Sequence, residues 1–201
     1  ADIERSPAAR ELCDGVENDC DAAVDEGCIE CDVTVPDDVG TIAYAVAGAS
    51  GGELICLRAG TWVGTVDFDG KALQVVGVSG PGATVLDGGG SGPVVRFDSG
   101  EGSDSILQGV TVSGGSASYG GGIYIASSSP SLLSVLVRDN TATADGGGIY
   151  ITDGLPSLLA VTIQDNESGG KGGGLAAYFA APQLSGVTVT DNEAGSLGGG
   201  L

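Results

Sequence analysis

Acidic side chains near the start of the chain have the spacing of a calcium-binding loop. Counted from residue 17, they fall at positions 1, 3, 5 and 9, with a backbone carbonyl at position 7. Hard oxygen ligands at this density suit Ca²⁺, because the carboxylates would otherwise repel one another. We therefore predict a Ca²⁺ site with these ligands: Glu17, Asp19, Asp21, Ala23, Asp25 and Glu26.

Two positions depart from that loop. Ala22 stands where a glycine normally makes a sharp turn, and Cys28 stands where a glutamate normally binds the ion with both oxygens. We include Glu26 among the ligands because it can take the place of that glutamate. The alternative is an acidic, disulfide-stapled linker that holds no ion tightly. Copper and zinc are disfavoured because the chain has no His and no Met.

Four of the five cysteines lie in the same segment, residues 1–35, which has few apolar side chains to bury. Disulfides or a metal must then hold it together, as in exported proteins. We expect two bridges among Cys13, Cys20, Cys28 and Cys31, leaving Cys56 as a small buried hydrophobe. The alternative is a Cys31–Cys56 bridge that ties the acidic segment to the first coil.

The segment from Cys13 to Glu26 reads Cys-Asp-Gly-Val-Glu-Asn-Asp-Cys-Asp-Ala-Ala-Val-Asp-Glu. It resembles a metal-binding motif of large secreted bacterial proteins, Cys-Asp-Gly-x-Asp-Asn-Asp-Cys-Asp-Gly-x-x-Asp-Glu. Glu17 and Ala22 are the two substitutions. The resemblance implies an exported protein with a bound cation.

We call residues 1–35 the acidic head. The part of the chain that carries this head is built of repeats with a period of about 26 residues. Each repeat contains short apolar runs separated by Gly, Ser, Asp and Asn, and none holds an amphipathic stretch long enough for a helix. This pattern predicts a right-handed parallel β-helix over residues 53–201. The glycine-rich parts of the repeats are Gly120-Gly-Gly-Ile-Tyr-Ile125, Gly146-Gly-Gly-Ile-Tyr-Ile151, Gly172-Gly-Gly-Leu-Ala-Ala177 and Gly198-Gly-Gly-Leu201.

Equivalent residues of successive coils should stack about 4.8 Å apart. The columns that begin at Val110 and Val112 should face inward, and the column that begins at Thr111 should face out. The asparagines at one turn should hydrogen-bond along their column. The predicted asparagine column is Asn140, Asn166 and Asn192, and the outward column is Thr111, Leu136, Thr162 and Thr188.

Residues 36–52 separate the head from the repeats. Their pattern predicts a short helix and a linker. Val39, Ile42, Ala43 and Val46 have helical spacing, and glycines end the run. Such a helix would cover the open edge of the first coil. At the other end the chain stops within a repeat at Leu201, which leads us to expect self-association or continuation through an open coil.

From about residue 36 the chain resembles the right-handed β-helix, pectin-lyase-like superfamily. The resemblance rests on Arg58-Ala-Gly-Thr-Trp62, Leu86-Asp-Gly-Gly-Gly90 and the triple-glycine repeats. It implies a fold more than a function, because the superfamily includes polysaccharide lyases and hydrolases as well as adhesins and other surface proteins.

An enzyme would need a concentrated polar site. The hydrolase branch of the superfamily needs a histidine motif, and the chain has no His. The lyase branch uses acidic calcium ligands beside a basic residue, for which the weak candidates are Arg138, Asp139, Asp165 and Asp191. The alternative is that Asp-Asn is ordinary turn chemistry, repeated because the fold repeats.

The net charge of −20 with only seven basic residues argues against nucleic acid, whose phosphates need clustered Lys and Arg. No apolar run reaches the length of a membrane span. We therefore predict a non-enzymatic, extracellular or cell-surface module for structure, adhesion or assembly, stabilised by Ca²⁺. The alternative is a lyase-like enzyme or carbohydrate-binding β-helix that acts on acidic glycans, and surface glycans are the expected ligands.

Overall fold

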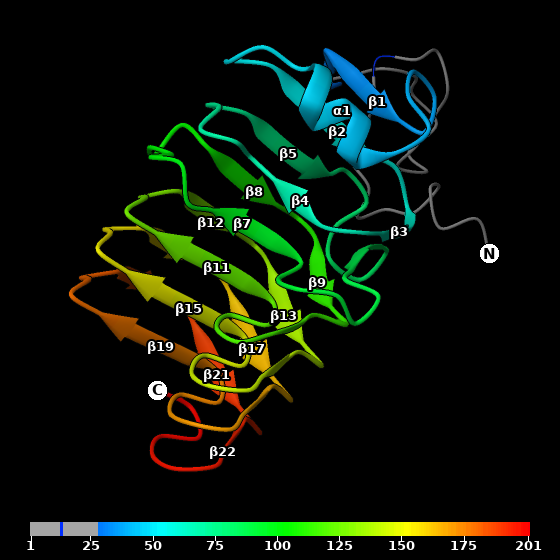
Figure 1. The fold of residues 1–201 in the computed structure, drawn as a ribbon. Coiled ribbons are helices and arrows are strands. Elements are labelled where there is room, and N and C mark those ends of the chain that lie inside the picture. Colours follow the sequence, from blue (N-terminus) through cyan, green and yellow to red (C-terminus); the bar gives the residue numbers. More distant parts are fainter. Residues whose placement is uncertain (1–12, 14–27) are drawn as a thin grey trace.

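The computed structural model of the chain describes residue 13 and residues 28–201. These residues form a parallel β-solenoid in which each coil contributes one strand to each of several long sheets (Figure 1). The predicted β-helix is confirmed. One helix, α1 (Ile42–Gly48), lies at the N-terminal end of the coils.

The two longest sheets form consecutive faces of the solenoid, since their strands follow one another in each coil, and the strands within each sheet pair in parallel. The seven-stranded sheet has the order β1 (Val33–Val35), β2 (Leu54–Leu57), β5 (Gln74–Gly77), β8 (Ile106–Gln108), β12 (Ser131–Leu133), β16 (Ser157–Leu159) and β20 (Gln183–Ser185). The six-stranded sheet has the order β3 (Gly60–Val63), β6 (Thr84–Asp87), β9 (Thr111–Ser113), β13 (Leu136–Arg138), β17 (Thr162–Gln164) and β21 (Thr188–Thr190).

Two further sheets complete the coils. The five-stranded sheet consists of β4 (Val66–Asp67), β7 (Val95–Phe97), β11 (Ile123–Ala126), β15 (Ile149–Thr152) and β19 (Leu175–Tyr178). The four-stranded sheet consists of two-residue strands: β10 (Ser116–Ala117), β14 (Thr141–Ala142), β18 (Glu167–Ser168) and β22 (Glu193–Ala194).

The register of the strands reproduces the repeat. Ile123 pairs with Ile149 and Ile149 pairs with Leu175, so each coil here advances the chain by 26 residues. The earlier coils are less regular, because Val75 pairs with Leu107, which lies 32 residues further on. The regular and irregular coils nevertheless share one continuous apolar core.

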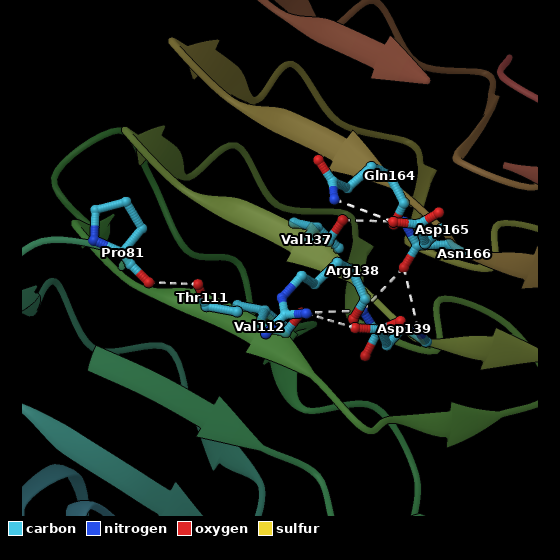
Figure 2. A network of polar contacts seen from close by, with 10 residues as sticks. Pro81, Thr111, Val112, Val137, Arg138, Asp139, Gln164, Asp165 and Asn166 are labelled. Carbon is cyan, nitrogen blue, oxygen red and sulfur yellow. Dashed lines mark hydrogen bonds and ion pairs between the residues drawn. The ribbon is translucent and has the colours of Figure 1, made fainter. Parts of the chain in front are cut away.

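The inward columns are confirmed. The buried residues of the first column are Val110, Val135 and Val161, and those of the second are Val112, Val137 and Ile163. The prediction that Thr111 faces solvent is wrong, since its exposed fraction is 2%. Its hydroxyl donates a hydrogen bond of 2.5 Å to the carbonyl of Pro81, so the loop before β6 covers this end of the column (Figure 2).

Helix α1 begins at Ile42, so Val39, which the spacing placed on the helix, lies before its first residue. Thr41 is its N-cap and accepts a hydrogen bond from the backbone N–H of Tyr44, whereas Asp38 accepts one from the N–H of Thr34. Ile42, Ala45 and Val46 are buried, and Ala43, predicted on this face, is exposed. Lys71 donates to the carbonyls of Val46 and Ala47, which places a cation at the negative end of the helix. The helix thus closes the N-terminal end of the core, as predicted.

The preferred pairing of the cysteines is wrong. The structure contains Cys13–Cys28 and Cys31–Cys56 bridges, so Cys56 is a buried half-cystine. The alternative bridge from Cys31 to the first coil is confirmed. The bridge forms where β1 pairs with β2. The register of these two strands places Thr34 beside Cys56.

Removing this bridge with Cys31→Ala and Cys56→Ala is expected to lower the free energy of unfolding by about 3 kcal/mol. The reason is that the bridge closes a loop of 25 residues and restricts the unfolded chain. Urea unfolding followed by circular dichroism measures the change. The matched control is the Cys13→Ala, Cys28→Ala pair, which leaves the link to the first coil intact. An unchanged unfolding midpoint for the Cys31, Cys56 pair would contradict the expectation.

Candidate functional site

The predicted Ca²⁺ ligands lie outside the described residues. These are Glu17, Asp19, Asp21, Ala23, Asp25 and Glu26. Over residue 13 and residues 28–201, no group of three or more Cys, Asp or Glu side chains is arranged to hold a metal ion. The Cys13–Cys28 bridge joins the two residues that flank these ligands in the sequence.

The structure does place the four weak catalytic candidates along one edge of the six-stranded sheet. Arg138 ends β13, and Asp139, Asp165 and Asp191 follow the strands of three successive coils. Two of these aspartates are in direct backbone contact, because the N–H of Asp139 donates to the carbonyl of Asp165 at 3.2 Å. The column predicted from the repeat is therefore real.

Each carboxylate in this column is engaged by the side chain just before it. Arg138 donates to Asp139 at 2.9 Å, and Gln164 donates to Asp165 at 3.0 Å (Figure 2). Thr190 repeats the contact with Asp191 at 2.9 Å. All three aspartates have φ of 53° or 54°, a left-handed conformation that Asp tolerates better than most residues. Turn chemistry therefore accounts for the column.

Arg138 does not head a basic groove. In the sheet its partner on the next coil is Gln164, and its ion pair with Asp139 is exposed, with side-chain exposures of 43% and 57%. Exposed pairs of this kind contribute little to stability. The geometry therefore gives no support to a base that would take a sugar proton.

The asparagine column lies directly inside this edge. Asn140 donates from its side-chain amide to Asn166 at 3.0 Å, and Asn166 donates to Asn192 at 2.9 Å, which confirms the predicted ladder. The same amides also donate to backbone carbonyls, including that of Val137. This ladder is a structural element because it satisfies buried backbone groups at the turn.

Glu101 is a buried carboxylate that the repeat pattern did not reveal. Its exposed fraction is 2%, and it accepts hydrogen bonds from the N–H groups of Gly70 and Ser99 and from the hydroxyl of Ser128. These donors come from three successive coils, so Glu101 fastens their loops to one another. All its contacts in the described residues serve this structural role.

A cluster of tyrosines covers the outer face of the five-stranded sheet. Tyr124 and Tyr150 occupy paired positions on β11 and β15, and their rings are parallel within 4° at a centroid distance of 5.7 Å. Tyr119, from the turn before β11, contacts Tyr150 at 4.9 Å. Tyr178 of β19 contacts Tyr150 at 5.7 Å.

The repeat places Ala176 after Tyr150 in this column, and this position by itself ends the aromatic run. Tyr178, two residues further along β19, extends it instead: its hydroxyl donates to Asp145 at 2.9 Å. This hydrogen bond raises the pKa of Tyr178, and burial raises the pKa of Tyr150. Both hydroxyls therefore stay protonated at neutral pH. A column alignment alone misses Tyr178, because its ring crosses from one column to the next.

Arg96 continues the cluster toward the N-terminus. Its guanidinium lies 5.4 Å from the ring centre of Tyr124, a cation–π contact. It also forms ion pairs with Asp67 and Asp98. The hydrogen bond to Asp98 raises the pKa of Arg96, so the side chain remains a cation that two carboxylates neutralise.

Beside Arg96 lies an open groove of about 320 Å³, which we call the Tyr119 groove. The residues that line it are Gly92, Pro93, Arg96, Ala117, Ser118, Tyr119 and Tyr124. Tyr119 was not singled out by the sequence. The signal is the position just before each triple glycine, which changes from Tyr119 to Asp145 to Lys171 while the three glycines after it repeat. The stacking of the glycines therefore does not fix the residue type at this position.

Comparison with known families matches residues 134–152 to the Chlamydia polymorphic membrane protein repeat. The matched segment runs from the turn before β13 to the end of β15 and contains Asn140 and the second triple glycine. It therefore corresponds to part of one coil, about a tenth of the chain. A comparison with curated proteins gave no match. Within the described residues, no helix has the length and apolar character to cross a membrane.

Proposed function

We propose that the chain is a non-enzymatic, exported module whose β-helix forms a scaffold for adhesion or assembly at a cell surface. One observation carries the proposal. The repeated polar side chains of the solenoid are used by the stacking of the coils: the asparagines satisfy buried turns, and each repeated aspartate is engaged by its preceding neighbour. What remains is a rigid surface without a concentrated catalytic group among the described residues.

Two findings support the location. Disulfide bridges persist in oxidising compartments outside the cytosol, and the structure contains two of them. The repeat that matches residues 134–152 is that of a membrane protein family of Chlamydia, which supports a surface-exposed β-helix. Adhesion and assembly are the uses that a long, rigid and repetitive surface offers.

Labelling of intact cells tests the location. A membrane-impermeant amine reagent should modify the exposed Lys171 while the cells are whole, with a cytosolic protein as the unlabelled control. Protease shaving of the same cells should remove the chain from the surface. Labelling that appears only after lysis would overturn the proposal.

Calcium stabilisation of the acidic head is part of the same proposal. Its support is the ligand spacing from Glu17 to Glu26 and the clustering of carboxylates that need a counter-charge. The Cys13–Cys28 bridge supports it as well, because it brings together the residues that flank these ligands.

Removal of calcium with EDTA is expected to lower the melting temperature, and added Ca²⁺ should restore it. Ca²⁺ at 100 times its dissociation constant would contribute about 2.7 kcal/mol to folding. Differential scanning calorimetry measures the shift. The matched control is Asp19→Asn with Asp21→Asn, which keeps every cysteine and should abolish the response. An identical melting curve with and without EDTA would contradict calcium binding.

A further inference from the structure

The strongest unassigned feature of the molecule is the Tyr119 groove at the N-terminal end of the tyrosine cluster. Its lining includes Arg96 of β7 and Tyr124 of β11, two neighbouring strands of the five-stranded sheet that are labelled in Figure 1. None of its lining residues belongs to the asparagine ladder or to the aspartate column. Strand register places Arg96 beside Tyr124, but it does not explain the position of Tyr119, which lies in a turn.

The ring faces in the cluster are not equally available. Tyr124 has Arg96 on it at 5.4 Å and Tyr150 stacked against it at 5.7 Å, so its faces are largely covered. Tyr150 is contacted by three other tyrosine rings. Tyr119 makes a single ring contact and remains 43% exposed. It is the ring that can receive a flat apolar partner.

The groove also supplies hydrogen-bonding groups beside that ring. Arg96 has donors, and Ser118, Tyr119 and Tyr124 carry hydroxyls that both donate and accept. A volume of about 320 Å³ is at the lower end of small-molecule sites. This combination of one exposed aromatic face and several hydroxyl partners suits a sugar ring, which has apolar C–H faces and a polar rim.

Charge decides between neutral and acidic sugars. The only cation in the groove lining, Arg96, is already paired with Asp67 and Asp98. The chain as a whole carries a net charge of −20 and therefore repels polyanions. An acidic sugar would need a cation that is not already neutralised, whereas a neutral sugar needs only the donors and acceptors present.

We infer that the Tyr119 groove binds a neutral pyranose unit of a glycan, which stacks on Tyr119 and hydrogen-bonds to Arg96 and the neighbouring hydroxyls. This inference names the class of ligand that the proposed surface module binds, and it rests on that proposed function. It also revises the expected ligand from an acidic glycan to a neutral one. Tyr150 acts as a positioning residue, because its ring contacts that of Tyr119 at a centroid distance of 4.9 Å.

The test is an NMR titration of the purified, ¹⁵N-labelled chain with neutral hexasaccharides of glucose, xylose, mannose and N-acetylglucosamine, and with hexagalacturonate as the acidic probe. We expect at least one neutral probe to shift amide signals at Tyr119 and its groove neighbours. Tyr119→Ala should weaken that binding about tenfold or more, the scale of one aromatic contact. Tyr119→Phe keeps the ring and should retain most of the affinity.

Tyr44→Ala is the matched control, because Tyr44 is an exposed tyrosine on α1, far from the groove in the sequence. It should bind as the unaltered chain does. Absence of binding to every neutral probe, binding to hexagalacturonate alone, or unchanged binding by Tyr119→Ala would each overturn the inference. The proposed surface function would survive those results, because cell labelling tests it separately.

Discussion

Asn166→Ala is expected to destabilise the folded chain by about 4 kcal/mol, because it removes the middle of the asparagine ladder. Asn166 is 1% exposed, and its amide donates to the carbonyls of Val137 and Gln164 and to Asn192. Its oxygen accepts from the backbone and the side chain of Asn140. Alanine leaves these buried groups without partners, and each unsatisfied group costs about 1–3 kcal/mol.

Urea unfolding followed by circular dichroism measures this loss. Gln164→Ala is the matched control two residues away, because its side chain reaches only the exposed Asp165. We expect the control to change the free energy of unfolding by less than about 0.5 kcal/mol. Equal effects of the two substitutions would show that the ladder does not hold the coils together.

Gly147→Ala is expected to destabilise the chain by about 4 kcal/mol or more, through a clash between neighbouring coils. A Cβ at residue 147 would lie 2.3 Å from the carbonyl oxygen of Glu167 and 2.5 Å from that of Gly173. Both atoms belong to the backbone of the next coil, so no side chain can turn away. Relief requires the coils to separate and to lose the hydrogen bonds between the triple glycines.

Thermal unfolding and the yield of soluble protein measure this effect. Gly102→Ala is the control, because a Cβ there meets nothing within 4 Å. We expect the control to shift stability by less than about 1 kcal/mol, in either direction. A Gly147→Ala protein with the same melting temperature as the control would refute the close-packing role of the triple glycine.

The repeat in the sequence was sufficient to predict the β-helix, its inward columns and its asparagine ladder. In a stacked solenoid, a residue meets its own equivalents one coil above and below. The residue types along the sequence therefore report the contacts in space. Val110 and Asn140 could be placed in this way because their neighbours, Val135 and Asn166, carry the same side-chain chemistry.

Contacts that do not follow the period escaped this reasoning. Thr111 is covered by the Pro81 loop, which belongs to an irregular coil with no repeat to predict its path. The Cys31–Cys56 bridge depends on the pairing of β1 with β2, and Cys31 precedes the repeats. Glu101 was missed for the same reason, since its donors come from loops of unequal length.

The sequence by itself determined the fold, the period and the polar columns, because identical side chains recur at the one spacing that stacks them. It also predicts a cation site in the acidic head, whose ligands lie outside the described residues. Only the tertiary structure decided which aromatic face is free. Tyr124 and Tyr178 lie in different columns and Tyr119 lies in a turn, yet all three contact Tyr150. Those contacts depend on side chains that lean across the sheet, and a residue count along the chain carries no information about that direction.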